Sequence, residues 1–306
     1  MSCKLLQERV AVEAPSGTNR IAVKKIILAT DFSEVSLAAV PYVRAVAAHY
    51  DAEVYVVHVV GSGVFLLLPQ PEQEMALHEA ERMMRGFLQS ASAWGPSWKN
   101  LIQGGEPSEV LRQLGKKLDI DLLVLGTNGR RGLHRFVLGS VAEEIFRWVP
   151  CPVLTIGPKA KRAIPQEVRL SHLLFATDLA PSSVEALPCA LQLAEEYAAP
   201  LTLLHVVKTK QQRGEAEKRL EALISKEGNS GRMPELLVET GSPARMILNT
   251  AASKQSDLIV LGVRSGGTWD RLATHAPGPV AYNVVAQAPC PVLTLRSQRI
   301  RSESEE

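Results

Sequence analysis

Short apolar runs alternate with longer amphipathic segments along most of the 306 residues. A short apolar run is typical of a strand buried on both faces of a parallel sheet, and a longer amphipathic segment is typical of a helix covering it. In the first half this pattern predicts strands at residues 25–30, 53–60, 98–103, 122–125 and from 153, with helices ending near 50, at 72–93, from 107 and at 140–148. Such alternation predicts an α/β fold with right-handed crossovers and helices on both faces of each sheet.

The chain also repeats itself at four places, in the same order in each half. The matched segments begin at Lys25 and His172, Tyr55 and Thr202, Asp121 and Asp257, and Pro150 and Pro289. Strands are therefore expected in the second half near residues 170, 201, 235, 257 and 292. We predict a duplicated domain, at residues 21–157 and 168–297, joined by a basic segment that contains proline and is typical of a linker.

Candidate chemistry lies just after the apolar run at residues 122–125. Gly126 and Gly129 interrupt the chain there, and Gly139 and Ser140 follow nine residues later, with Ser140 and Glu143 in the positions of a capping box. A strand, a glycine loop and a helix N-terminus in succession gather unpaired backbone amides that suit a phosphate group. The alternative is an ordinary connection in which the glycines only turn the chain. The spacing matches neither a Walker loop nor a dinucleotide fingerprint.

Composition narrows the classes of partner. Hydrophobic residues make up 46% of the chain and charged residues 22%, an ordinary globular balance. A net charge of +2 and an aromatic content of 5% give no support to a nucleic-acid surface. No signal peptide or membrane-spanning run is apparent, and the four cysteines lack the spacing of a metal site. These features predict a cytoplasmic protein whose partners include neither nucleic acid nor a membrane.

The glycine loop, together with Ala-Thr-Asp-Phe-Ser at residues 29–33 and His-Val-Val at 58–60, resembles the universal stress protein family in its tandem form. The resemblance covers both halves. It implies two doubly wound domains of the adenine nucleotide alpha hydrolase type, each a five-stranded parallel sheet of order 3-2-1-4-5. It further implies an ATP-binding stress-response regulatory protein, with Mg²⁺ plausible on the phosphates.

The same resemblance implies a set of contact residues for the nucleotide. Adenine and ribose are expected near the ends of the first, second and fourth strands, and the phosphates are expected on the loop. The residues carried over are Ala29, Thr30, Asp31, Val59, Leu125, Gly126, Asn128, Gly129, Gly139, Ser140 and Val141.

Structural alternatives stand beside several of these roles. Asp31, three residues before Glu34, has the pattern of a helix cap, and its counterpart Asp178 persists in the second half. His58 and His205 are interpreted as hydrogen-bonded structural residues. The basic residues at 130–135 either close over the phosphates or form a solvated face.

The second half departs from the nucleotide pattern. Ser265 replaces the second glycine and Pro279 replaces the serine, which removes an amide and a hydroxyl donor. We therefore predict one nucleotide site, in the first half. The resemblance further implies an intramolecular pseudo-dimer in which the last strands of the two halves pair. Further pairing into a homodimer is left open. No residue is identified as catalytic, so the alternatives are a slow ATPase, or an interaction module that binds AMP, a cyclic nucleotide or none.

Overall fold

The structure is a computed structural model that describes residues 22–61, 65–90, 98–127, 142, 144–145, 149, 151–160, 168–227, 232–263 and 280–296. The elements of the first half are β1 Lys25–Ala29, α1 Glu34–Tyr50, β2 Glu53–Val60, η1 Phe65–Leu67, α2 Gln70–Ser90, β3 Trp98–Gly104, α3 Pro107–Leu118, β4 Leu122–Gly126 and β5 Val153–Ile156. Those of the second half are β6 Leu173–Thr177, α5 Pro181–Val184, α6 Leu187–Glu196, β7 Leu201–Val207, η2 Lys210–Gln212, α7 Arg213–Glu227, β8 Glu235–Thr240, α8 Pro243–Ser253, β9 Leu258–Val263, α9 Val280–Gln287 and β10 Val292–Arg296.

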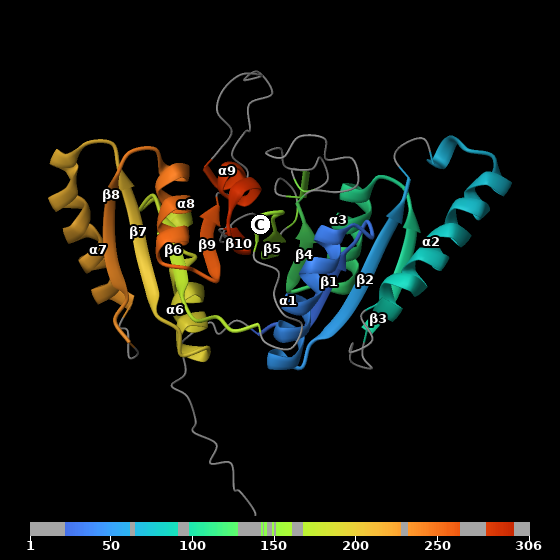
Figure 1. Ribbon diagram of the computed structural model, residues 1–306, viewed down its shortest axis with the longest axis horizontal. Coiled ribbons are helices and arrows are strands. Elements are labelled where there is room, and N and C mark those ends of the chain that lie inside the picture. Colours follow the sequence, from blue (N-terminus) through green and yellow to red (C-terminus); the bar gives the residue numbers. More distant parts are fainter. Residues whose placement is uncertain are drawn as a thin grey trace, which may run out of the picture.

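These strands form one continuous sheet of ten, in the order β3-β2-β1-β4-β5-β10-β9-β6-β7-β8 (Figure 1). Within each half all pairs are parallel, and the predicted order 3-2-1-4-5 is confirmed in both halves. The halves meet where β5 and β10 pair antiparallel, with Leu154 opposite Leu293. The predicted pairing of the last strands is therefore present, and it covers two sheet edges that would otherwise be exposed.

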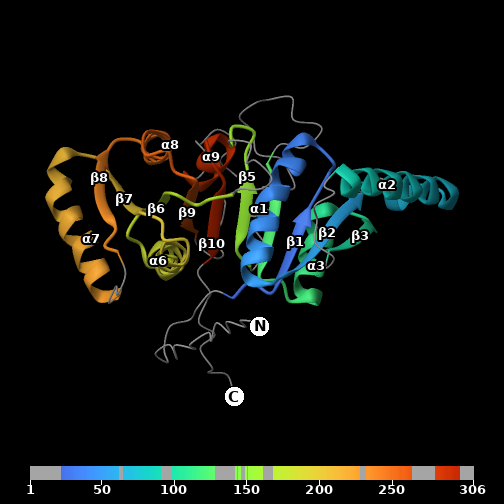
Figure 2. The same cartoon turned by 60° about the horizontal axis from the view of Figure 1, so that its bottom comes forward.

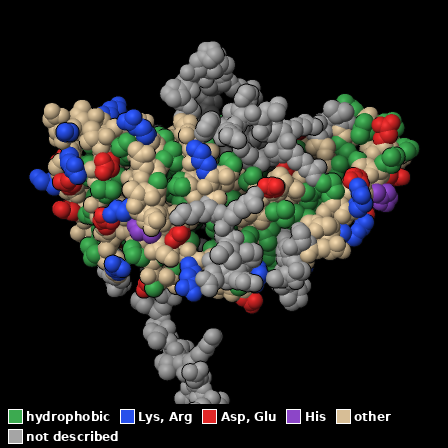
Figure 3. Space-filling view, in the orientation of Figure 1, with side chains coloured by type: hydrophobic (Ala, Val, Ile, Leu, Met, Phe, Trp, Pro, Cys, Tyr) green, Lys and Arg blue, Asp and Glu red, His purple; other side chains and the backbone are tan. Residues whose placement is uncertain are grey.

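Two buried clusters lie on opposite faces of the sheet, because successive strand residues point to opposite sides. Leu28 of β1 belongs to a cluster beneath α1, α2, α6 and α7, and Ile27 belongs to a cluster beneath α3, α8 and α9. At the junction of the halves, α1 and α6 lie on one side of β5 and β10 and α9 lies on the other (Figures 1 and 2). Charged side chains of both signs gather over α7 and α2 at the two ends of the molecule (Figure 3).

Element boundaries differ from the sequence-based expectation at a few places. Helix α2 begins at Gln70 rather than at residue 72, since the carbonyl of Pro69 already accepts from the amides of Glu72 and Gln73. Strand β6 begins at Leu173, three residues later than expected, where the Leu173 amide first bonds to the Pro200 carbonyl. The helix expected at 140–148 lies mostly outside the described residues.

Candidate functional site

The carboxyl ends of β1 and β4 lie side by side in the first half. Ala29 is opposite Leu125, so Thr30 and Gly126 follow at the same edge of the sheet. The chain passes from β1 to β2 on one side and reaches β4 on the other, which makes this edge the point where the strand order reverses. In open α/β sheets such a point is the usual place for a ligand. The adjacency inferred from the sequence is confirmed.

Three of the predicted contact residues share one face of the sheet at this edge. Leu125 is buried in the cluster beneath α3, α8 and α9, and the half-buried Ala29 and Val59 pack against the same cluster. They come from three neighbouring strands, β4, β1 and β2. An apolar surface of this kind, ending at the rim of the sheet, suits the flat face of a nucleobase.

Thr30 and Asp31 form a hydrogen-bonded turn that leads into α1. The Asp31 Oδ1 atom accepts from the Ser36 hydroxyl at 2.6 Å and from the Ser33 amide at 3.1 Å. The Thr30 hydroxyl accepts from the Phe32 amide at 3.0 Å, and Phe32 has a left-handed backbone with φ of 62°. This network holds the backbone of Phe32 in the left-handed conformation, which residues other than glycine rarely adopt.

The residue that caps α1 differs from the expectation. Its N-cap is Ser33, whose side chain accepts from the Ser36 amide at 3.3 Å, and Glu34 is already in the helix. The interpretation of Asp31 as the capping residue was therefore wrong. Asp31 lies two residues before the N-cap and holds it in place, because its carboxylate accepts from the Ser33 amide and the Ser36 hydroxyl.

The second half repeats this network almost atom for atom. Asp178 Oδ1 accepts from the Ser183 hydroxyl at 2.5 Å and from the Ala180 amide at 2.9 Å. The Thr177 hydroxyl accepts from the Leu179 amide at 2.9 Å, and φ of Leu179 is 61°. Since the second half departs from the nucleotide pattern, these contacts account for the aspartate without a ligand. The base contact expected for Asp31 remains a prediction.

Substitution of the paired aspartates separates the two roles of Asp31. We expect Asp31→Ala and Asp178→Ala each to lower the free energy of unfolding by about 1–2 kcal/mol, because each removes a charged acceptor of two hydrogen bonds. Only Asp31→Ala should also weaken nucleotide binding if Asp31 reaches the base. Urea unfolding and calorimetric titration with ATP measure the two effects, and equal ATP affinity in both variants would assign Asp31 a purely structural role.

The two histidines at the ends of β2 and β7 have structural contacts, as expected. His58 Nδ1 lies 2.7 Å from the Thr30 carbonyl oxygen, and His205 Nδ1 lies 2.8 Å from that of Thr177. The His58 ring also lies 4.2 Å from the Phe32 ring, between centroids. Each histidine therefore ties the second strand of its half to the turn after the first strand, and the structural interpretation is confirmed.

Gly126 is required by packing against the start of α1. A Cβ atom at this position would lie 2.9 Å from Val35 Cγ1 and 3.2 Å from the Val35 carbonyl carbon. At the equivalent Gly262 a Cβ atom would lie 2.5 Å from Ser183 Cα and 2.7 Å from its carbonyl oxygen. Close helix packing thus explains the first glycine of each loop. Contact with a phosphate is not needed to explain glycine at either position.

Five predicted contact residues lie outside the described residues, and their places stay predictions. They are Asn128, Gly129, Gly139, Ser140 and Val141. The basic residues at 130–135 also lie outside them. In the described part of the chain, no group of three or more His, Cys, Asp or Glu side chains is arranged to hold a metal ion.

Sequence reasoning missed the role of Phe65, which packs over the carboxyl ends of β2 and β3. Its side chain is 6% exposed and occupies the space that Cβ atoms at Gly61 and Gly104 would need. The sequence alone assigns no role to the segment at 61–71. Two glycines that end neighbouring strands were the available signal, since a pair of missing side chains leaves room for a ring.

The fold is that of a doubly wound α/β protein, a class in which ligands usually bind where the strand order reverses, here at the ends of β1 and β4. The family model for the universal stress protein family matches residues 22–157 and 170–296. The chain therefore belongs to the universal stress protein family, in its tandem two-domain form.

Individual relatives agree with this assignment. A universal stress protein of Methanocaldococcus jannaschii is 35% identical over 143 residues, which cover 45% of this chain and 84% of that protein. A putative universal stress protein of Staphylococcus aureus is 29% identical over 141 residues, 44% of this chain and 85% of that protein. The crystal structure of a universal stress protein from Archaeoglobus fulgidus superposes with a TM-score of 0.69 at 20% identity, covering 89% of this chain and 98% of that chain, which supports the fold. Among the helices of the described ranges, none combines the length and apolar character needed to cross a membrane.

Proposed function

We propose that this chain is an ATP-binding regulatory protein of the stress response, cytoplasmic, with one nucleotide site in its first half. The observation that carries the proposal is the meeting of β1 and β4 at the reversal point, where the apolar face of Ala29, Val59 and Leu125 ends. The glycine pattern from Gly126 to Ser140 begins at the same edge. A base surface and a source of backbone amides are therefore expected next to each other.

In this arrangement adenine lies against Ala29 and Val59, with Thr30 and Asp31 near its edge. The ribose lies beside Leu125 and Gly126, and the phosphates accept hydrogen bonds from the loop. The loop donors are the amides of Asn128, Gly129, Gly139, Ser140 and Val141, with the Ser140 hydroxyl. Mg²⁺, which retains several of its waters and binds phosphate oxygens readily, needs few protein ligands here.

The second half serves as the structural partner of the first. Pro279 has no amide hydrogen, and Ser265 places a side chain where the family pattern has glycine. Its sheet nevertheless keeps the strand order of the first half, and β10 completes the junction with β5. We infer that this half was retained for the ten-stranded sheet and does not bind ATP in the usual mode.

In this proposal the protein binds ATP as a regulatory ligand and hydrolyses it weakly at most. Rapid hydrolysis needs a residue that orients water and groups that stabilise the transferred phosphoryl group. The sequence offers no clear candidate for either role. The rival function, an ATPase, predicts sustained phosphate release that scales with protein concentration.

Analysis of co-purifying nucleotide tests the proposal. The purified protein is extracted with acid and the released nucleotides are identified by mass and quantified against the protein. We expect ATP, at no more than one molecule per chain. An empty extract together with no binding of added ATP would contradict the proposal, whereas AMP or a cyclic nucleotide in the extract would keep the site and change its ligand.

A further inference from the structure

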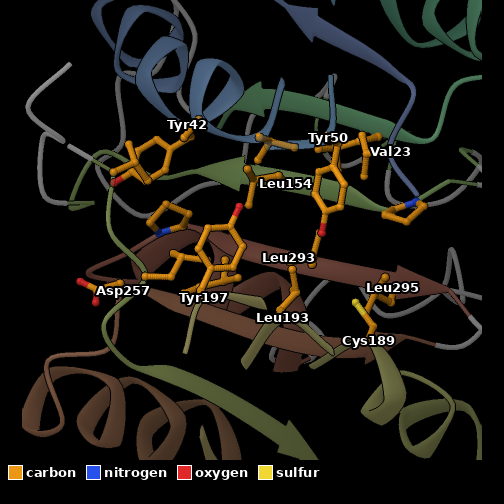
Figure 4. A pocket seen from close by; sticks show the side chains of 18 of the residues that line it. Val23, Tyr42, Tyr50, Leu154, Cys189, Leu193, Tyr197, Asp257, Leu293 and Leu295 are labelled. Carbon is orange, nitrogen blue, oxygen red and sulfur yellow. The ribbon is translucent and has the colours of Figure 1, made fainter. Parts of the chain in front are cut away.

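A groove crosses the junction of the two halves on the face covered by α1 and α6 (Figure 4). The space between its walls, about 770 Å³, includes volume that is open to solvent, so the groove is a partly open cleft and not an enclosed cavity. The floor includes Leu154 of β5 and Leu293 of β10, and the walls include Tyr42 and Tyr50 of α1 with Leu193 of α6 and the adjoining Tyr197. In Figure 4 these side chains converge on the space between the two helices.

The groove is built jointly by equivalent residues of the two halves. Counting from the matched turns at Asp31 and Asp178, Tyr50 corresponds to Tyr197 and Val46 to Leu193, and all four line the groove. Leu154 and Leu293 face each other across the antiparallel pair. Neither half alone has this groove, because each supplies only one wall and one strand of the floor.

The groove lies on the opposite face of the sheet from the proposed nucleotide site. Leu154, Leu193 and Leu293 belong to the buried cluster beneath α1 and α6. Ala29, Val59 and Leu125 belong to the other cluster or pack against it. A molecule in the groove therefore makes no contact with these three residues, and the two sites are separable by experiment.

The lining favours an uncharged ring-shaped molecule over an anion. Three tyrosine rings and several aliphatic side chains make up most of it, and its charged members among the described residues are the carboxylates Asp121 and Asp257, with no lysine or arginine. Each carboxylate accepts two backbone amides, from Lys24 and Lys25 and from Ser171 and His172. Burial raises the pKa of the Tyr42 hydroxyl to about 12, with Cys290 and Asp257 acting in the same direction. An anion would meet negative charge in a poorly solvated space.

A cluster of side chains fixes one end of the groove. The Tyr50 hydroxyl donates to Glu196 Oε2, and His49 Nε2 lies 3.4 Å from the same oxygen. The His49 ring stacks on Tyr197 at 4.9 Å between centroids and meets Tyr50 edge-on at 4.6 Å. These contacts link α1 to the C-terminal end of α6, so two aromatic walls are held in place before a ligand arrives, which lowers the cost of binding.

We propose that this groove is a second binding site, which takes one uncharged aromatic molecule per chain and depends on both halves. Binding is non-covalent. The one thiol in the described lining, Cys189, is buried, and burial raises its pKa to about 12, so the reactive thiolate is scarce at neutral pH.

The test compares two fluorescent probes that share a ring system. N-phenyl-1-naphthylamine is uncharged at neutral pH, and 8-anilinonaphthalene-1-sulfonate carries an added sulfonate. We expect saturable binding of the uncharged probe at one molecule per chain, with a dissociation constant of about 10 µM. The sulfonate probe should bind at least about tenfold more weakly. Absence of saturable binding, or equal binding of both probes, would overturn the proposal; a groove filled by another part of the chain or by a second copy would give the first of these results.

Variants locate the bound probe. Val46→Trp and Leu193→Trp place an indole in the groove from opposite walls, and each should weaken binding of the uncharged probe at least about tenfold. Met75→Trp, on the exposed surface of α2, is the matched control and should bind as the wild type does. Added ATP should not displace the probe. Unchanged binding in both groove variants, each with a wild-type melting curve, would place the probe elsewhere and overturn the proposal.

Discussion

Replacing Gly262 with alanine is expected to lower the free energy of unfolding by about 3 kcal/mol, and replacing Gly126 by about 1 kcal/mol. The difference follows from what each new methyl group would meet. At Gly262 its nearest neighbours are backbone atoms of Ser182 and Ser183, at 2.5–2.9 Å, so α5 and β9 must separate. At Gly126 the nearest atom is a methyl carbon of the Val35 side chain, at 2.9 Å, and backbone atoms follow only at 3.2 and 3.3 Å, so a small shift of α1 relieves these contacts.

Urea unfolding of the two variants measures these costs. Gly86→Ala in α2 and Gly214→Ala in α7 are the matched controls, since a Cβ atom at either helical position has no neighbour within 4 Å. Both controls should be more stable than the wild type by about 0.5–1 kcal/mol, because alanine favours the helix. Wild-type stability in Gly262→Ala would show that the close packing of β9 on α5 is not what requires glycine at this position.

This pair of glycines bears on how the loop is interpreted. The second half retains Gly262 although it lacks the later glycine and serine of the nucleotide pattern. The first glycine therefore reports helix packing in both halves. The proposal of a nucleotide in the first half rests on the sequence pattern at Gly129, Gly139 and Ser140 and on the apolar face at the ends of β1, β2 and β4.

Substitution of Gly129 and Ser140 is expected to weaken ATP binding strongly. The double substitution Gly129→Arg with Ser140→Pro gives the first half the obstacles of the second, a side chain at the second glycine and a proline without an amide hydrogen. Two lost hydrogen bonds to a charged group amount to about 3 kcal/mol or more, so ATP affinity should fall by about 100-fold or more. Calorimetric titration with ATP measures the change.

The second half supplies the control for this experiment. Ser265→Arg changes the position equivalent to Gly129 and should leave ATP affinity unaltered if that half binds no ATP. Circular dichroism should show the same helix content in all variants. A double variant that binds ATP as tightly as the wild type would remove the loop from the site.

The sequence was sufficient for the architecture because its signals are local and repeated. Apolar runs such as 122–125 mark strands buried on both faces, and the duplicated order of segments specifies two equal halves. The family resemblance implied that the strand order reverses between β1 and β4 and that β5 pairs with β10, and both predictions are confirmed. Helix boundaries were less certain, since several polar residues near Ser33 had the composition of a cap.

The remaining features depend on contacts between distant residues, which periodicity does not report. Phe65 fills a space left by glycines on two different strands. The hydrogen bond between Tyr50 of α1 and Glu196 of α6 joins residues that are 146 positions apart in sequence. The groove beside it forms only when both halves are folded. Such features depend on how side chains that are distant in sequence pack together in the folded chain.

A crystal structure of the chain grown with saturating ATP would show directly whether the first half holds the nucleotide. We expect one nucleotide per chain, with its base on Ala29 and Val59 and its phosphates on the loop that follows Gly126. A nucleotide at the ends of β6 and β9, or protein atoms filling the space beyond β1 and β4, would contradict this expectation.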